Sequence, residues 1–461
     1  MSEGSLSGVQ SLWFETALLP GGWASSVRIA YAGGRIVGVE AGVAAQAGDE
    51  RGASAVPGLG NVHSHAFQRG MAGLAETRGP SGDDFWTWRT MMYRFVDRLG
   101  PAEVEAVAAL AYAEMLESGF TRVGEFHYLH HDLDGRPYAD PAQLAGAIAA
   151  AAEASGIGLT LLPVFYAHSG FGGAPPTPRQ RRFINTPDSF ARLVEASRAA
   201  VRALPDAVVG VASHSLRAVT PAQLALVAPM AGGAPTHIHI AEQAREVEDC
   251  LAWSGARPVE WLLDHADVDA RWCLVHATHL TDAETDRLAA SGAVAGLCPI
   301  TEANLGDGLF PAPRFLAAGG TFGIGSDSNV LIDAAEELRI LEYGQRLTRQ
   351  GRNILASQAR PSVGAALFAG AHAGGAQALG VAPLGLEVGA PADIVCLDAN
   401  HPSLTGRQGD ALLDAWIFAV RGGAVENVWR RGRKVVEAGR HVERDAIAKA
   451  YRQVISRLLA A

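Results

Sequence analysis

The chain alternates short apolar or β-branched runs with longer stretches in which apolar positions recur at helical spacing. The short runs are typical of buried strands, and the Ala-, Leu-, Glu- and Arg-rich stretches between them are typical of amphipathic helices. Eight such runs occur, at 54–61, 121–126, 159–165, 208–212, 236–240, 272–275, 293–298 and 321–325. Eight strands alternating with helices predict an α/β fold, a (β/α)8 TIM-like barrel of parallel strands.

The two ends of the chain have a different pattern. Short alternating runs separated by Gly turns occupy residues 8–56, and the same pattern returns after residue 385, at 392–397, 425–430 and 433–437. We therefore predict three parts: a small flanking β domain from both chain ends, a barrel, and a C-terminal helix. Their limits are 1–56 plus 385–440, 57–384, and 441–461.

Composition narrows the class of protein. Of 461 residues, 48% are hydrophobic and 19% charged, which is typical of a globular chain with a large core. The net charge of −10 argues against nucleic acid or an anionic membrane as partner. The sequence has no apolar run of about 18 residues to span a bilayer, and residues 1–10 do not resemble a signal peptide. Four scattered cysteines without a CxxC pair are interpreted as reduced core residues of a cytoplasmic protein.

Reactive side chains follow several predicted strands at their C-terminal ends, where barrel enzymes build their active sites. His63 and His65 end the first run and, as alternate residues of a strand, point to the same face. The fifth, sixth and eighth runs end in His239-x-x-Glu242, His276 and Asp327. Three imidazoles and a carboxylate from different strands suit a Zn²⁺ or Fe²⁺ site with an open position for water.

Each of these residues also has an ordinary structural interpretation. A His-x-His pair is often incidental, and His239 alone could be a hydrogen-bonded core histidine. Asp327 could cap a helix, and Glu242 could face a helix dipole. Their joint placement at four strand ends favours the metal site. The chain's two lysines, Lys434 and Lys449, lie near the C-terminus, so the barrel has no lysine that could form a carboxylated bridge between two metals.

These residues and their surroundings resemble the amidohydrolase superfamily. The matching motifs cover nearly the whole chain: Pro57-Gly58-Leu59, His63-x-His65, His239-x-x-Glu242, His276, Gly325-Ser326-Asp327 and, in the flanking β domain, Pro391-Ala392-Asp393-Ile394-Val395. The segment 298–306 is similar to the deaminase branch of that superfamily. Within this branch the chain most resembles the formimidoylglutamate deiminases of histidine degradation, on segments 63–70, 84–89, 126–130, 213–217 and 237–243.

The resemblance implies a role for each site residue. One Zn²⁺ per chain, with Fe²⁺ or Mn²⁺ as alternatives, would be held by His63, His65, His239 and Asp327. The ion would activate water, His276 and Asp327 would orient the water and accept its proton, and Glu242 would pass a proton to the leaving nitrogen. The substrate-binding residues would be Gln68, Arg89, Tyr128, His214 and Arg217.

The implied reaction is hydrolysis of N-formimino-L-glutamate to N-formyl-L-glutamate and ammonia. Because arginine pairs bidentately with carboxylates, Arg89 and Arg217 fit a small-molecule dicarboxylate. Two alternatives stay open: a related deaminase acting on guanine, an adenosine-type purine or a triazine-like compound, and a metal-free barrel that serves as an assembly scaffold. The resemblance also implies a homodimer. The Pro- and Arg-rich segment 175–187 is expected to be a surface excursion or a lid.

Overall fold

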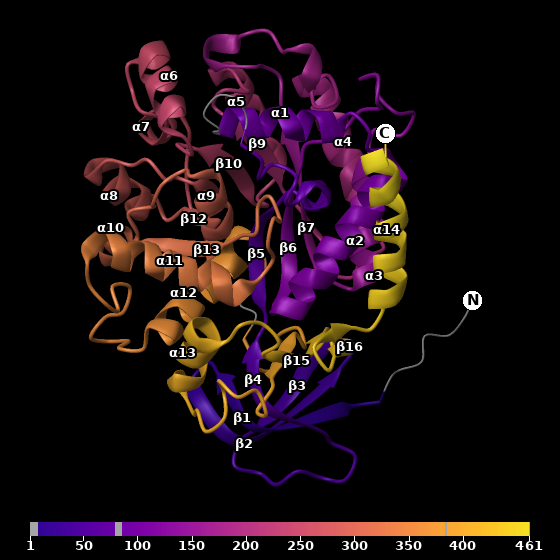
Figure 1. Ribbon diagram of the computed structural model, residues 1–461, viewed down its shortest axis with the longest axis vertical. Helices are drawn as coiled ribbons and strands as arrows, with labels where there is room; N and C mark the ends of the chain where they lie inside the picture. Colours follow the sequence, from indigo (N-terminus) through magenta and orange to yellow (C-terminus); the bar gives the residue numbers. More distant parts are fainter. Residues whose placement is uncertain (1–7, 79–84, 383–384, 461) are drawn as a thin grey trace.

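The computed structural model describes residues 8–78, 85–382 and 385–460. A barrel of parallel strands forms its centre, and the first and last barrel strands pair to close it (Figure 1). In order around the barrel the eight strands are β5 (Leu59–Ser64), β6 (Phe120–His127), β7 (Gly158–Phe165), β9 (Val211–Ser215), β10 (Thr236–Ile240), β11 (Trp272–His276), β12 (Val294–Leu297) and β13 (Thr321–Ile324). The predicted TIM-like α/β barrel is confirmed.

Helices surround the barrel, and several begin at a cap that the sequence provides. Thr186, Thr220 and Thr281 each accept the backbone N–H three residues on, which satisfies a donor that the first turn leaves open. The α-helices are α1 (Phe85–Val96), α2 (Pro101–Ser118), α3 (Gln143–Ser155), α4 (Pro187–Ala200), α5 (Pro221–Val227), α6 (Ala244–Ser254), α7 (Pro258–His265), α8 (Asp282–Ser291), α9 (Pro299–Leu305), α10 (Ala312–Ala317), α11 (Ala334–Arg349), α12 (Val363–Ala378), α13 (Asp410–Ala419) and α14 (Arg444–Ala460).

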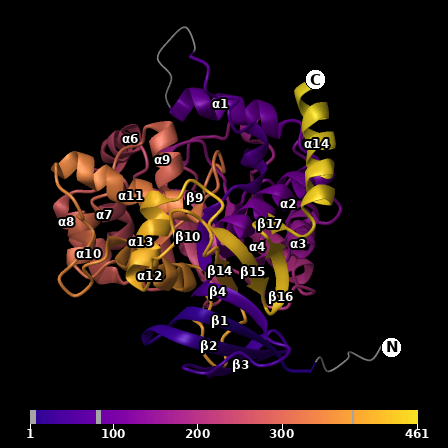
Figure 2. The same cartoon turned by 60° about the horizontal axis from the view of Figure 1, so that its bottom comes forward.

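A second, mixed sheet lies beyond one end of the barrel (Figure 2). Both chain ends build it, as the alternating patterns predict, and the final helix α14 packs along α2 (Figure 1). Its strands are β1 (Gln10–Leu19), β2 (Gly22–Ala32), β3 (Arg35–Glu40), β4 (Glu50–Pro57), β14 (Ile394–Leu397), β15 (Val425–Arg430), β16 (Arg433–Glu437) and β17 (Arg440–His441). The exact domain limits stay a prediction, and residues 1–7, 383–384 and 461 lie outside the described residues.

Two of the predicted strands are wrong in extent. The run 54–61 is two strands, because its first half is the end of β4 in the mixed sheet and its second half begins β5 in the barrel. The run 208–212 is divided at Gly210 into the short strand β8 (Val208–Val209) and β9. Gly210 passes so close to Pro235 that a Cβ would lie 2.4 Å from the Pro235 carbonyl oxygen, which a side chain cannot tolerate. Periodicity alone does not reveal such a division.

The end of the barrel that faces the mixed sheet is closed by the chain after α12. Leu379 fills the space beside Gly60 and Gly124, and a Cβ on either glycine would approach its side chain within 2.8 Å. Thr160 Oγ1 donates to the Leu379 carbonyl at 2.9 Å. At the opposite end, α1 lies over the carboxyl ends of the strands (Figure 1). That end is therefore the one available for a site.

A buried arginine, Arg430, connects the mixed sheet to the barrel. Arg430 of β15 donates to Asp393 at 3.0 Å and to the Thr121 carbonyl of β6 at 3.1 Å, and it is ion-paired with Asp206. Arg430 is 4% exposed and Asp393 1%, so each charge depends on its partners. Among the described residues, no helix is both long enough and apolar enough to cross a membrane.

Candidate metal centre and substrate pocket

Left-handed backbone turns aim the reactive residues into the open end of the barrel. Ala241 follows β10 with φ 51°, and His276 ends β11 with φ 68°. The Ala277 N–H donates to the Ile240 carbonyl at 3.0 Å, which ties the two strand ends together. Asp327 follows β13 with φ 41°, and its N–H donates to the His63 carbonyl at 2.9 Å. Non-glycine residues adopt such angles at a cost, which is typical of functional sites.

His63, His65, His239 and Asp327 bring four donor atoms together. His63 Nε2 lies 3.2 Å from His65 Nε2 and 2.9 Å from His239 Nε2. Asp327 Oδ1 lies 3.3 Å from both His63 Nε2 and His65 Nε2. All four residues are buried, and the ring of Phe126 packs against the three imidazoles. The sequence-predicted ligands therefore form one group.

The hydrogen bonds of these histidines indicate which atoms carry lone pairs. His65 Nδ1 donates to the Phe126 carbonyl at 3.0 Å, and His239 Nδ1 donates to the His214 carbonyl at 2.9 Å. Since neutral imidazole has one N–H, the Nε2 atoms of both residues face the centre as acceptors. Acceptors that converge with a carboxylate repel one another unless a cation lies between them. Donation of the far ring nitrogen to a carbonyl is also the usual support of a metal-ligating histidine.

The electrostatics fit the same interpretation. Burial lowers the pKa of His63 to about 3 and also lowers the pKa values of His65 and His239, so these imidazoles are neutral. Burial acts to raise the pKa of Asp327, but the hydrogen bond from His63 and the nearby imidazoles hold it well below its ordinary value. Neutral imidazoles and an ionised carboxylate are the protonation states that a divalent metal binds.

Glu242 and His276 lie beside the metal ligands. Their nearest atoms, Glu242 Oε1 and His276 Nε2, are 3.9 Å apart. Burial raises the pKa of Glu242 to about 7, although His276 and Arg217 act to lower it. Burial acts to lower the pKa of His276, but Glu242 and the hydrogen bond to Glu302 outweigh it and raise that pKa to about 10. Glu242 can therefore gain or lose a proton near neutral pH, whereas His276 holds one. A divalent ion bound by the neighbouring ligands would oppose the positive charge of His276 and lower its pKa, which would free Nε2 to accept a proton.

The predicted substrate-binding residues all line one pocket. Arg217 Nη2 lies 3.9 Å from Glu242 and equally far from Glu246. Arg89 of α1 donates to the Tyr166 hydroxyl at 2.7 Å. The residues that line the pocket include every predicted catalytic and substrate-binding side chain: Gln68, Arg89, Tyr128, His214, Arg217, Glu242, His276 and Asp327. The structure thus brings together the whole set that the sequence analysis singled out.

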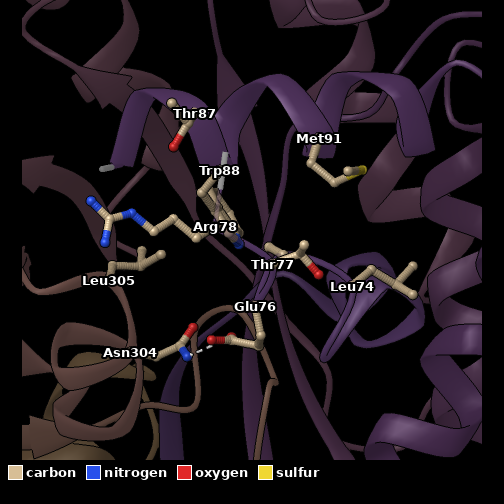
Figure 3. Close-up of a pocket in the computed structure, with 10 residues that line it drawn as sticks. Leu74, Glu76, Thr77, Arg78, Thr87, Trp88, Met91, Asn304 and Leu305 are labelled. Carbon is tan, nitrogen blue, oxygen red and sulfur yellow. Dashed lines mark hydrogen bonds between the residues drawn. The ribbon is translucent and has the colours of Figure 1, made fainter. Parts of the chain in front are cut away.

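The free space in this pocket is small, and a larger chamber lies outside it. The inner space is about 40 Å³, room for a few water molecules, whereas the outer chamber is about 550 Å³. Trp88 and Leu305 line both, so the two spaces adjoin at these side chains. Figure 3 shows the outer chamber between α1 and the loop that holds Glu76, whose carboxylate accepts a 2.9 Å hydrogen bond from Asn304.

The segment 175–187 is a surface excursion only in its first half. Its second half is anchored, because Gln180 donates to the Tyr166 hydroxyl at 2.8 Å and Arg182 donates to carbonyls of His131 and Val96. Gln180, Arg182 and Phe183 are at most 2% exposed. The segment therefore supports α1 and, through Tyr166, the guanidinium of Arg89.

The sequence analysis missed several residues of the site. Glu302 accepts from His276 Nδ1 at 3.2 Å, and Glu246 accepts the Glu242 N–H at 3.1 Å. Tyr166 is the first residue after β7, so its position at a strand end was the signal that could have found it. Glu246 lies four residues after Glu242, in the first turn of α6, which was a weaker signal. Of the segment 84–89, Asp84 lies outside the described residues.

Comparisons with known proteins match nearly the whole chain. A protein-family model with the description "Amidohydrolase family" matches residues 54–435. A second family model, "Formimidoylglutamate deiminase HutF, N-terminal domain", matches residues 12–53. Formimidoylglutamate deiminase of Pseudomonas aeruginosa is 53% identical over 456 residues, which cover 98% of this chain and 100% of the relative.

Solved structures share the fold over nearly the full length. An amidohydrolase from Brucella melitensis has 58% sequence identity and a TM-score of 0.95, with 98% of this chain and 100% of that chain covered. An adenosine deaminase from Xanthomonas campestris with bound zinc has 24% identity and a TM-score of 0.82, with 98% and 99% covered. This last likeness concerns the fold alone.

Proposed function

The chain belongs to the amidohydrolase family, and from this membership we propose that it hydrolyses N-formimino-L-glutamate to N-formyl-L-glutamate and ammonia, a step of histidine degradation. One observation carries the proposal: the same pocket holds a metal-ligating group, two groups that can carry protons, and two arginines. The relative that is 53% identical across the chain supports the same reaction. The enzyme is a metal-dependent hydrolase.

The His-His-His-Asp group would hold one divalent ion, and we propose zinc. Three imidazole nitrogens and one carboxylate oxygen are a common Zn²⁺ ligand set. When bound, such an ion lowers the pKa of a water molecule to about 7 and supplies hydroxide at neutral pH. The chain's two lysines lie outside the barrel, so no carboxylated lysine can bridge a second ion. Metal analysis after reconstitution with Zn²⁺, Fe²⁺ or Mn²⁺ tests the choice of ion.

The chain's own groups supply the proton transfers. His276 Nε2 and the Asp327 carboxylate face the pocket, where they orient the attacking water and accept its proton. Glu242, with a pKa raised to about 7, then protonates the departing nitrogen so that ammonia leaves rather than an amide anion. Proton transfer by positioned side chains is typically worth 10²–10⁴-fold in rate. The 3.9 Å between Glu242 and His276 supports a role for both groups at one reacting centre.

Two guanidinium groups give the pocket its preference for a dicarboxylate. Arg89 and Arg217 line it together with the neutral donors of Gln68 and Tyr128, and Gln68 Nε2 donates to the Tyr128 hydroxyl at 3.0 Å. A bidentate arginine–carboxylate pair combines charge with two hydrogen bonds. A purine offers no carboxylate to either arginine, which favours the glutamate derivative over a purine or triazine substrate.

Ammonia release from the zinc-loaded protein tests the proposal. N-formimino-L-glutamate is compared with N-formimino-glycine, guanine and adenosine at equal concentrations. Fast turnover of the glutamate derivative and slow or no turnover of both purines is the expected result. Preferred turnover of a purine would contradict the proposed substrate while leaving the metal-dependent chemistry in place.

Two further properties are proposed, the first from the family resemblance and the second from the cysteines. We expect a homodimer, which sedimentation at micromolar concentration tests, and a monomer there would contradict it. We also expect a cytoplasmic location, which the four free, buried cysteines support. Cell fractionation tests the location.

A further inference from the structure

We propose that Glu302 is a positioning residue that holds the His276 ring with Nδ1 protonated, so that Nε2 is presented to the attacking water. The inference rests on the proposed function and adds a residue to its machinery. Glu302 Oε1 lies 3.2 Å from His276 Nδ1, on the side of the ring away from the pocket. His276 Nε2, on the other side, faces Glu242.

Glu302 is itself held in place by the start of α9. The same Oε1 atom accepts the Cys298 N–H at 2.9 Å, and the Glu302 N–H donates to the Cys298 carbonyl at 2.9 Å. Glu302 is 5% exposed and His276 1%, so water does not compete for this contact. The side chain and the backbone of Glu302 are therefore both held by Cys298, independently of the contact with His276. A carboxylate constrained in this way accepts a hydrogen bond but has little freedom to move elsewhere.

The backbone of His276 does not by itself fix the orientation of the ring. The residue ends β11 in the left-handed region, with φ 68°, and the next residue, Ala277, has φ 48°. Without a bond to Nδ1, the ring could turn about its side-chain torsions or exchange tautomers, and Nε2 would then present a hydrogen to the water. Glu302 opposes both alternatives, because its Oε1 atom, which already accepts the Cys298 N–H, acts as an acceptor toward Nδ1 as well.

The chemistry is that of a base oriented by a third group. As the water O–H bond breaks, the proton forms a bond to His276 Nε2, and the ring becomes an imidazolium. Glu302 accepts the Nδ1–H bond throughout and so stabilises the positive ring. The same arrangement of carboxylate, imidazole and nucleophile operates in Ser-His-Asp triads, where an Asp→Asn change lowers kcat by about 10⁴-fold through the wrong tautomer.

The same three residues could in principle ligate a metal, because donor atoms of His276, Cys298 and Glu302 lie within 4.8 Å of one another. Two observations favour the hydrogen-bonded arrangement. The Glu302 oxygen that would bind a metal already accepts two N–H groups. Burial also raises the pKa of Cys298 well above its ordinary value, which favours the thiol over the thiolate that metals require.

The experiment compares two buried carboxylates that support the start of α9. Glu302→Gln keeps the size and an acceptor for Cys298 but removes the charge facing His276. Glu337→Gln is the matched control, because Glu337 is fully buried and accepts the Ile300 N–H at 2.9 Å, whereas its described hydrogen bonds do not reach His276. We measure kcat, KM and metal content per chain for both variants and for the unchanged protein.

We expect E302Q to lose about 10²–10⁴-fold in kcat, with KM within threefold and one metal retained per chain. E337Q should keep kcat within threefold. An equal loss in both variants would reduce Glu302 to a structural support and overturn the proposal. Two metals per chain in the unchanged protein, with one lost in E302Q, would overturn it in favour of a second metal site.

A spectroscopic measurement keeps the proposal testable if E302Q does not fold. In the ¹⁵N spectrum of the metal-loaded, unchanged protein, the His276 signals are assigned by their loss in His276→Asn. We expect a proton on Nδ1, and an Nδ1 without a proton would refute the role of Glu302. Because this measurement needs no substrate, it still tests Glu302 if N-formimino-L-glutamate is not hydrolysed.

Discussion

Arg89 and Arg217 are expected to bind different carboxylates of N-formimino-L-glutamate. Arg217 Nη2 lies 3.9 Å from Glu242, the proposed proton donor to the leaving nitrogen. The α-carboxylate is attached close to the reacting formimino group, so Arg217 is assigned to it. Arg89 reaches the pocket from α1, where Tyr166 accepts its hydrogen bond at 2.7 Å. The γ-carboxylate, several bonds further from the reacting carbon, is assigned to Arg89.

The assignment predicts a different outcome for each arginine. Arg89→Ala removes a charge-assisted bidentate pair inside a pocket with room for few waters, a loss of about 2–4 kcal/mol. With about 1.4 kcal/mol for each factor of ten, kcat/KM for the glutamate derivative falls about 30- to 1,000-fold. N-formimino-glycine keeps the α-carboxylate and has no γ-carboxylate, so the same variant should change its kcat/KM by less than about threefold. Arg217→Ala should lower kcat/KM for both substrates.

A coupled assay for ammonia gives kcat/KM for both substrates with the unchanged protein and each variant, after metal content has been matched. Arg89→Lys is the control for charge, because lysine keeps the charge but lacks the planar fork, and we expect an intermediate loss. An equal loss on both substrates in R89A would refute the assignment of Arg89 to the γ-carboxylate. No loss on either substrate would remove Arg89 from the binding site.

Three further changes have definite expected outcomes. Glu242→Gln should lower kcat by about 10²-fold or more while metal content, measured by atomic absorption, stays the same, and loss of metal would contradict its role as proton carrier. Arg430→Met leaves the buried Asp393 without its charged partner and should lower the free energy of unfolding by about 3–5 kcal/mol, measured by urea denaturation. Burial lowers the folded-state pKa of His441, whose Nε2 donates to the Ser155 carbonyl at 2.8 Å. Neutral His441 thus contributes stability above its unfolded pKa of about 6.5, and this contribution is lost as the pH falls through the lower folded pKa. His441→Gln removes the titrating group, so below about pH 6.5 the urea midpoint of the variant should fall less steeply than that of the unchanged protein.

Much of the site was predictable because strand geometry is regular. Alternate residues of a strand point to one face, so His63-x-His65 had to present both imidazoles together. The carboxyl ends of parallel barrel strands meet at one end, so His239, His276 and Asp327 had to approach them. The arginines on loops and helices, such as Arg89 on α1, depended on the family resemblance, since many surface arginines have the same local pattern.

The sequence by itself determined the type and order of the elements, since side-chain periodicity and the residues at strand ends are local properties. Only the tertiary structure decided which atoms meet. It divided the run 54–61 between two sheets, because hydrogen-bond partners far along the chain, not local pattern, set where a strand pairs. It also placed Glu302 behind His276, a contact between the left-handed turn at the end of β11 and the start of α9 that neither segment indicates by itself. Contacts between segments far apart in sequence depend on the packing of the whole barrel, and therefore appear only when the barrel is closed.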